Sequence, residues 1–207
     1  MNPNAPESCF PLTRPEILKQ LAIETARMSF PGGMSRGKHQ ILKAGAKGKI
    51  EDFFARDPPL LIHDLGSRAS KIASDYDNWH SSQCEKLGSY LRERGCLGSP
   101  RNTQEVVAAK LMNTFMHQLM KYERFRCLWD QLHLPLDARV FSALRRWKSP
   151  TARLIVEKLG ERTTYAITFD DYRFTQEALW DLIAELNARP GATVKIGSRI
   201  ELNFLWL

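Results

Sequence analysis

One carboxylate of this chain, Asp137, lies where it could take part in catalysis. It follows the apolar turn Leu134-Pro135-Leu136 and directly precedes a segment, 138–147, whose apolar stripe is typical of an amphipathic helix. Between positions 138 and 156 the chain has no acid and five cations, which are Arg139, Arg145, Arg146, Lys148 and Arg153. A carboxylate in such a positive stretch suits chemistry on an anionic polymer that binds around it.

The same position also suits a purely structural role for Asp137. Aspartate is among the preferred N-cap residues, and a proline shortly before a helix is common. Asp137 could therefore accept hydrogen bonds from the backbone N–H groups of Arg139 or Val140. Position and spacing alone leave both interpretations open.

Two further motifs resemble functional sites but lack essential residues. Segment 32–39 has glycine and lysine at the offsets of a nucleotide-binding P-loop, but it ends in His39 where a magnesium-binding Ser or Thr is needed. His80 and Cys84 lie one helical turn apart, yet a zinc site needs two more ligands. We therefore expect no metal and no nucleotide or other cofactor.

The whole chain is basic and has the composition of a globular protein. Its 207 residues include 30 Lys and Arg against 23 Asp and Glu, which gives a net charge of +7 and favours a polyanionic partner. No long apolar run and no signal-peptide pattern is present, so we expect no membrane segment and a cytoplasmic location. The cysteines are scattered and expected to be reduced; they are Cys9, Cys84, Cys96 and Cys127.

Hydrophobic periodicity predicts that these residues are carried by a mainly helical fold. A glycine-containing break is expected at 94–100, a short strand is possible at 163–169, and Asp170-Asp171 suggests a surface helix start. The apolar tail, 200–207, should pack into the core. Helices are expected at 14–28, 67–94, 103–121, 138–147, 151–159 and 175–188, with a basic loop containing a short helix at 35–49.

Two segments together resemble the helix-hairpin-helix DNA glycosylases, particularly their divergent archaeal and 8-oxoguanine-type branch. The first, 98–107, reads GSPRNTQEVV and is similar to the glycine-rich hairpin and following helix of that family. The second, 134–140, reads LPLDARV and is similar to the segment that presents the family's catalytic aspartate. The stretch from 98 to 140 covers about a fifth of the chain.

The resemblance has departures that bear on the reaction. The hairpin keeps at best one of the family's glycines, and Asn102 stands where bifunctional members carry a catalytic lysine. The resemblance then implies a monofunctional enzyme that releases a base with water and does not cut the strand efficiently. Lys110 and Lys121, on the polar face of the predicted helix 103–121, are the less favoured amine nucleophiles.

What the resemblance implies is a single compact domain of two helical lobes with a cleft between them. The approximate parts are an N-terminal helical lobe, 1–93, a hairpin and catalytic lobe, 94–160, and a C-terminal segment, 161–207, that packs back. Such an enzyme rotates a base of double-stranded DNA out of the helix, and Asp137 would stabilise positive charge on the sugar. The expected DNA contacts are Gly98, Ser99, Arg101, Thr103, Arg139, Arg145, Arg146 and Lys148.

The identity of the excised base does not follow from the sequence. Oxidised guanine would fit the nearest branch of the family, and a bulky modified base of viral DNA would turn the same chemistry to defence. Aromatic side chains are the natural candidates for stacking on a base, with core packing as the alternative for each. The candidates are Tyr76, Trp79, His80, His117 and Trp129.

Two other functions stay open at the level of sequence. The chain could be a DNA-binding module that keeps the fold without catalysis, or a subunit of a larger repair or defence assembly. Retained salt-sensitive DNA binding without base release would indicate the module, and a concentration-dependent mass with weak DNA affinity would indicate the subunit.

Overall fold

The computed structural model describes residues 41–54, 72–98, 104–162, 166–191 and 195–206, together with the single position Ile23. Within these residues the chain is helical apart from turns, connections and one isolated antiparallel bridge between Leu42 and Leu97. The prediction of a mainly helical fold is confirmed for this part of the chain. The helices are α2 (Ala46–Phe54), α4 (Tyr76–Glu93), α5 (Gln104–Leu119), η2 (Glu123–Gln131), α6 (Ala138–Arg146), α7 (Pro150–Leu159), α8 (Phe169–Asn187) and η3 (Arg199–Trp206).

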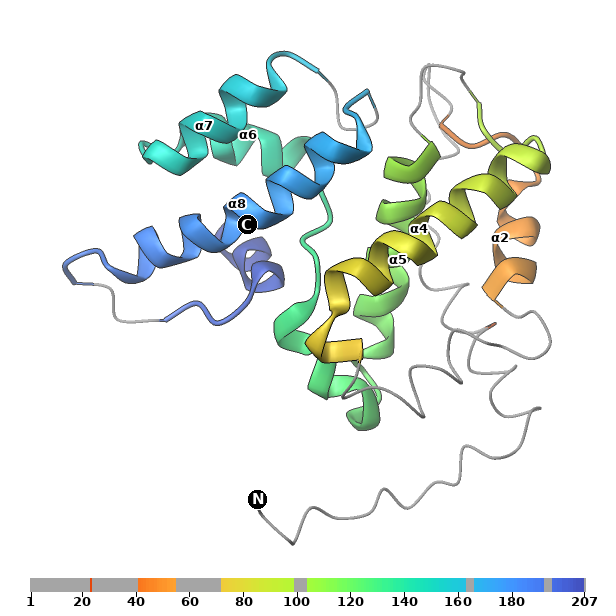
Figure 1. The fold of residues 1–207 in the computed structure, drawn as a ribbon, viewed down its shortest axis with the longest axis horizontal. Helices are drawn as coiled ribbons and strands as arrows, with labels where there is room; N and C mark the ends of the chain where they lie inside the picture. Colours follow the sequence, from red (N-terminus) through yellow and green to blue (C-terminus); the bar gives the residue numbers. More distant parts are fainter. Residues whose placement is uncertain are drawn as a thin grey trace, which may run out of the picture.

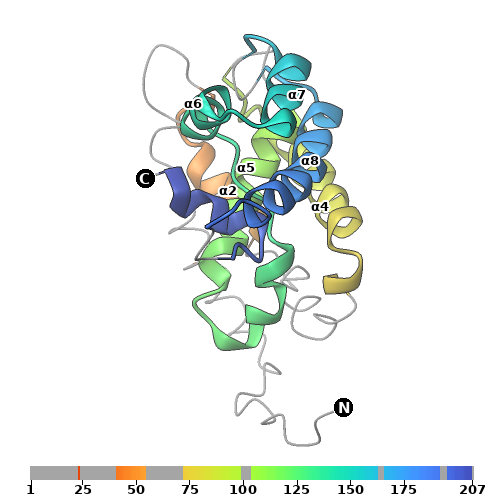
Figure 2. The same ribbon diagram turned by 90° about the vertical axis from the view of Figure 1, so that its left-hand side faces the viewer.

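The helices pack in two neighbourhoods that are joined by an extended segment (Figure 1). In one neighbourhood α4 packs along α5, and α2 packs on α4; in the other, α6 packs on α7 and α7 on α8. The start of α4 and η2 lie at the lower end of the molecule, whereas α6 and α7 lie at the upper end (Figures 1 and 2). Residues 132–137 run upward between them, and η3 contacts α8, α6 and η2.

The break predicted at 94–100 is confirmed over its described residues and has a clear local cause. Gly95 adopts a positive φ of 61°, which costs glycine little because it has no Cβ. Its N–H donates to the Arg92 carbonyl at 2.9 Å, and the Cys96 N–H donates to the Leu91 carbonyl at 2.8 Å. This pair of bonds is a Schellman motif, which ends α4.

Helix α8 begins at Phe169, six residues before the predicted start at 175. The Thr168 hydroxyl accepts from the Asp171 N–H, and the Asp171 carboxylate accepts from the Thr168 N–H, which together form a capping box. The prediction of a helix start at Asp170-Asp171 is thus confirmed, but its surface character is wrong for Asp171, which is buried because it closes the capping box and pairs with Arg162. The possible strand at 163–169 is wrong over its described residues, 166–169, because the capping box outweighs the weak local alternation.

The remaining helix predictions follow the same local signals. The helices predicted at 103–121, 138–147 and 151–159 are confirmed as α5, α6 and α7. The segment 67–94 contains helical residues 72–74 and then α4. The helix predicted at 14–28 is described only at Ile23, which is helical.

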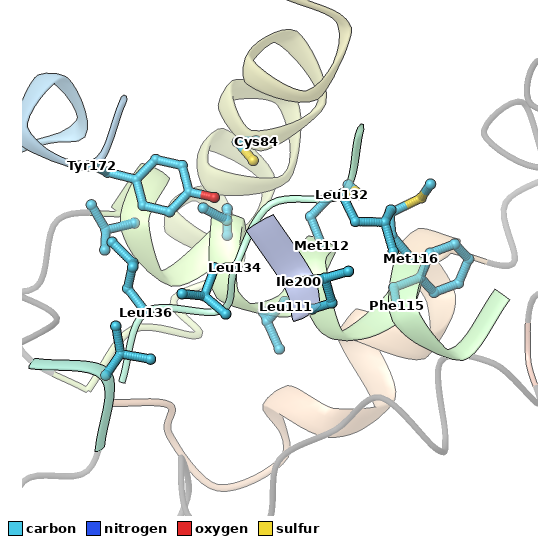
Figure 3. Close-up of a cluster of buried hydrophobic side chains, with 14 of the residues drawn as sticks. Cys84, Leu111, Met112, Phe115, Met116, Leu132, Leu134, Leu136, Tyr172 and Ile200 are labelled. Carbon is cyan, nitrogen blue, oxygen red and sulfur yellow. The ribbon is translucent and has the colours of Figure 1, made fainter. Parts of the chain in front are cut away.

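The core draws on both neighbourhoods and on the segment between them (Figure 3). Phe54 of α2 stacks on Phe115 of α5, with ring centroids 4.1 Å apart. Ile200 and Leu202 of η3 are buried, which confirms that the start of the apolar tail packs into the core. The core side chains around this junction are Leu111, Met112, Phe115 and Met116 of α5, Leu132, Leu134 and Leu136 of the extended segment, and Ile200 of η3.

Candidate functional site

Asp137 ends the extended segment and caps α6. Its backbone is extended, and its Oδ1 accepts from the Arg139 N–H at 2.8 Å and from the Val140 N–H at 3.1 Å. The capping role that the sequence left open is therefore confirmed. Both bonds use Oδ1, and among the residues that the structure describes no hydrogen bond to Oδ2 is found. The side chain is partly exposed, at the positive end of the helix dipole.

The cations that follow Asp137 are exposed to solvent, on α6 and just after its C-terminal end. Helix α6 buries Val140, Phe141 and Leu144, as its apolar stripe predicts. The Arg145 guanidinium lies 3.5 Å from the Gly160 carbonyl, to which it donates. The exposed cations of this surface, which we call the α6 basic surface, are Arg139, Arg145, Arg146 and Lys148.

The predicted hairpin contacts are described only at Gly98. Its N–H donates to the Ile41 carbonyl at 2.8 Å, next to the bridge between Leu42 and Leu97, so this amide is already engaged within the protein. Lys110 lies partly buried on α5. The other residues of this group, Asn102, Ser99, Arg101 and Thr103, lie outside the described residues.

The five predicted base-stacking residues form two sets of ring contacts. Tyr76 contacts Trp79 and His80, with centroids 5.6 and 5.7 Å apart. His117 of α5 and Trp129 of η2 form the second set, with ring centroids 6.0 Å apart. Tyr76 and His80 are buried, whereas the other three residues are partly exposed. In this conformation the first set contributes mainly to the core, and the second set lies closer to solvent.

The structure also contains a polar chain that sequence reasoning did not predict; its members are buried except Asp77 at its end, which is exposed. The imidazole of His133 bonds the Asp77 carboxylate through Nε2 at 2.7 Å and the Tyr172 hydroxyl through Nδ1 at 2.9 Å. The Asn113 side chain donates to the same hydroxyl at 2.9 Å, and its oxygen lies 2.7 Å from His80 Nε2.

The donors and acceptors of this chain fix one consistent pattern of protons. The Asp77 carboxylate can only accept, so His133 Nε2 carries a proton and His133 Nδ1 accepts from the Tyr172 O–H. The Tyr172 oxygen then accepts from the Asn113 amide, and the Asn113 oxygen accepts from a proton on His80 Nε2. Both imidazoles are neutral in this pattern. Each group donates its proton to the next group along the chain, and the last acceptor is Asp77.

The charge on Asp77 is balanced by one buried cation. Arg199 of η3, with a side chain only 1% exposed, donates from Nη2 to Asp77 Oδ1 at 2.9 Å. The Asp77 side chain is itself 54% exposed, so desolvation opposes its ionisation only in part, and the bonds from His133 and Arg199 hold the pKa of its carboxyl below the ordinary value of 3.8. Burial lowers the pKa of His133 to about 4, because the bond that His133 donates to Asp77 offsets only part of the desolvation.

The other ionisable groups around this chain are kept neutral by burial. Burial, followed by the nearby His133, lowers the pKa of His80 well below 6.5. Burial likewise raises the pKa of the Tyr172 and Tyr76 hydroxyls above their usual values. The Tyr76 hydroxyl and the Arg199 Nε–H have no hydrogen-bond partner within the described part of the protein. The polar chain is thus a series of neutral groups that ends in one ion pair, between Asp77 and Arg199.

Metal binding has little support in the residues that the structure describes. His80 and Cys84 do lie close, with Nδ1 and Sγ 3.5 Å apart. Among the described side chains, however, no group of three or more His, Cys, Asp or Glu is arranged to hold an ion. Among the same residues, no helix has the length and apolar character needed to cross a bilayer.

No protein-family model, curated protein or solved structure matches this chain. Its class is therefore defined by its own fold and site. It is a protein that is mainly helical in its described part, with a partly exposed carboxylate at the start of a basic helix and a buried polar network beneath the segment that leads to it.

Proposed function

We propose that this protein is a monofunctional DNA glycosylase, which rotates a damaged or modified base out of double-stranded DNA and hydrolyses its N-glycosidic bond. The observation that carries the proposal is the position of Asp137. Its Oδ1 is held by two backbone N–H groups, its Oδ2 has no partner among the described residues, and exposed cations follow on the same helix. A carboxylate oriented in this way suits a reaction on the sugar of a bound polyanion.

The chemistry that such a carboxylate supports is specific. Breaking the bond between base and sugar leaves positive charge on the sugar ring, as in glycoside hydrolysis. The negative charge of Asp137 would stabilise that charge through Oδ2, and the same oxygen could orient the attacking water. Because the cap restricts the side chain, little rearrangement would be needed during the reaction.

The α6 basic surface supplies the other half of the proposal. The exposed arginines of α6, together with Lys148 just after the helix, favour contacts with the DNA backbone, which position the duplex without reading its sequence. The two lobes of a helix-hairpin-helix glycosylase would then be the two neighbourhoods of helices, with α5 grouped with α4 and not, as in the lobe bounds 94–160 expected from the sequence, with α6. DNA would enter between them. In that arrangement Ser99, Arg101 and Thr103 would contact phosphate from the hairpin.

The absence of a strand-cleaving step is part of the same proposal and rests on the family resemblance. Asn102 occupies the position of the family's nucleophilic lysine, and an amide cannot form the covalent intermediate that lyase chemistry requires. Lys110 is the alternative nucleophile and is less favoured. Borohydride should therefore trap no covalent complex between the protein and base-containing DNA, and a trapped complex would contradict this part.

The experiment that tests the proposal is mass spectrometry of free bases released from DNA. The DNA panel contains oxidised, deaminated, alkylated and hypermodified nucleotides, and wild-type protein is compared with Asp137→Asn. Asparagine is as good an N-cap as aspartate, so this variant keeps the cap and removes the charge. A base released by the wild type and not by the variant supports the proposal and identifies the substrate.

A second candidate, a non-catalytic DNA-binding module, is favoured by one observation. Capping alone accounts for both hydrogen bonds that Asp137 makes. Under this alternative the panel yields no base with either protein, while salt-sensitive binding to DNA is retained and unchanged in Asp137→Asn.

A further inference from the structure

The residues that fix the position of Asp137 lie in the segment just before it. We call residues 132–136 the linker. Its leucines, Leu132, Leu134 and Leu136, are buried and face the core that Figure 3 shows. His133 is buried as well and bonds to Asp77 and Tyr172. The linker is therefore held on both sides, by apolar packing and by the polar chain.

Gln176 of α8 holds the backbone of the linker directly. Its side-chain oxygen accepts from the Leu134 N–H at 3.0 Å, and its amide nitrogen donates to the Leu134 carbonyl at 2.8 Å. Gln176 is only 1% exposed, so water does not compete for these two hydrogen bonds. One glutamine thereby satisfies both backbone groups of a buried residue that lies outside regular secondary structure.

Arg199 holds the entry to the linker. Its Nη2 donates to the Gln131 carbonyl at 2.7 Å and to the Asp77 carboxylate, and its guanidinium lies 5.1 Å from the ring centre of Trp180. Together with His133 and Gln176, Arg199 anchors three of the four residues from 131 to 134.

The chain between these anchors and Asp137 is short and stiff. Only Pro135 and Leu136 separate Leu134 from Asp137. The proline ring fixes its own φ and also restricts the backbone of the residue before it, Leu134. The buried side chain of Leu136 restrains the one residue that remains, so few bond rotations are left to absorb a shift of Leu134 before it reaches Asp137.

We propose that Gln176, His133 and Arg199 are positioning residues that set the location of the Asp137 carboxylate. This inference rests on the proposed function, because it states how the proposed catalytic group is held. Gln176 comes from α8, whereas His133 and Arg199 both bond Asp77 of α4, so the site depends on contacts with both neighbourhoods of helices. None of the three is proposed to touch DNA.

The test uses Gln176→Met, a variant of similar shape that loses both bonds to Leu134. The measured quantities are the dissociation constant for substrate DNA and the single-turnover rate constant of base release. A small displacement of a reacting group costs rate and not affinity, so we expect the rate constant to fall about 10- to 100-fold while the dissociation constant stays within about twofold. Hydrogen exchange of the Arg139 and Val140 amides should accelerate, because these amides bond to Asp137.

The matched control is Thr175→Val, at the neighbouring position of α8. Thr175 is fully buried and its hydroxyl bonds only within its own helix, to the Asp171 carbonyl. This control loses a buried hydrogen bond without touching the linker, so its rate constant should equal that of the wild type. If Gln176→Met does not fold, Tyr172→Phe, which removes the hydroxyl that binds His133, should show a smaller decrease in the same direction.

The outcomes separate this inference from the proposed function. If the wild type releases a base and Gln176→Met or Tyr172→Phe releases it at the wild-type rate, the positioning role is wrong and the function stands. If exchange at Leu134 accelerates but exchange at Arg139 and Val140 does not, the linker fails to transmit the change and the inference is also wrong. If the wild type releases no base, the proposed function itself fails.

Discussion

Asp137 combines a structural and a proposed chemical role in one side chain. Its Oδ1 completes the first turn of α6, and its Oδ2 is the oxygen available for chemistry. The two roles can be separated because asparagine supports the first and not the second.

The stability of Asp137 variants should depend on whether the side chain can still cap α6, and not on its charge. We expect Asp137→Ala to lower the free energy of unfolding by about 1 kcal/mol, because it removes the acceptor for two helix N–H groups. Asp137→Asn should stay close to the wild type. Urea unfolding measures both, with Asp130→Ala, an exposed aspartate of η2, as the control. Equal losses for the alanine and asparagine variants would contradict the capping account.

The buried chain should make the protein sensitive to acid. The folded pKa of His133, about 4, is below its ordinary value of 6.5, so the unfolded chain binds this proton first as pH falls. Above about pH 6.5, His133 is neutral in both the folded and the unfolded state and costs the protein no stability. As pH falls from 6.5 toward 4, the free energy of unfolding decreases by up to about 1.4 kcal/mol per pH unit. His80 acts with the same sign. Asp77, whose pKa is lowered, adds a further loss below its ordinary 3.8.

The variant that tests this pH dependence is His133→Gln. Glutamine can donate to Asp77 and accept from Tyr172 but does not titrate. The decrease in unfolding free energy between pH 7 and pH 5, from urea titrations, should be smaller in the variant, with the contribution of His80 remaining. An unchanged decrease would show that His133 is not the group responsible.

Individual residues were predicted unevenly from the sequence. Asp137 could be found because a cap is a local feature, made by residues two and three positions away. His133 gave only a weak signal. Leucines occupy every second position around it, at 132, 134 and 136, and this alternation indicates an extended segment that is apolar on one side. Its partners are 56 and 39 positions away, so no local pattern could identify them.

At the scale of elements, the junction between α7 and α8 is held by one carboxylate. Glu185 of α8 accepts from the hydroxyls of Ser149 and Thr151 and from the Thr151 N–H at 3.1 Å. Ser149 in turn caps α7 through the Ala152 N–H. These bonds lower the pKa of the Glu185 carboxyl and tie the start of α7, next to the α6 basic surface, to α8.

Removing this carboxylate should destabilise the protein. We expect Glu185→Ala to cost about 1 kcal/mol of unfolding free energy, since charge-assisted bonds are lost at a partly exposed site. Glu177→Ala, at an exposed position of the same helix, is the matched control and should be nearly neutral. Thermal or urea unfolding that ranks the two variants equally would refute the role of Glu185.

The elements themselves were largely predictable because helices are encoded locally. Periodicity located α5, α6 and α7, and a glycine marked the end of α4. The start of α8 was placed too late, because Thr168 and Asp171 form a capping box in a region whose hydrophobic pattern is weak. The apolar stripe shows where a helix packs, and the capping residues show where it begins.

At the scale of the whole molecule, the proposal predicts a strong electrostatic component in DNA binding. Each cation that contacts a phosphate releases counterions and adds about 0.9 to the slope of log affinity against log salt concentration. Arg145→Ala and Arg146→Ala should each reduce that slope by about this amount if the residue contacts one phosphate. Fluorescence titrations at several salt concentrations measure it. Lys86→Ala, an exposed cation on α4, should leave the slope unchanged, and a loss equal to that of Arg145→Ala would argue against a specific basic surface.

Long-range contacts account for what the sequence could not predict. Arg199 and Asp77 are 122 positions apart, and they bring η3 to the start of α4. From its residue type alone, Arg199, which directly precedes the apolar tail, is expected on the surface, because arginine is rarely buried without a partner. The polar network therefore became visible only once the fold had brought its members together.

The most direct test of the central claim is the single-turnover rate of base release by wild type and Asp137→Asn on the same DNA. The account predicts that the wild type releases the base, that the variant is slower by at least about 100-fold, and that both bind the DNA equally well. Equal rates for the two proteins would show that the Asp137 carboxylate only caps α6 and would contradict its proposed catalytic role.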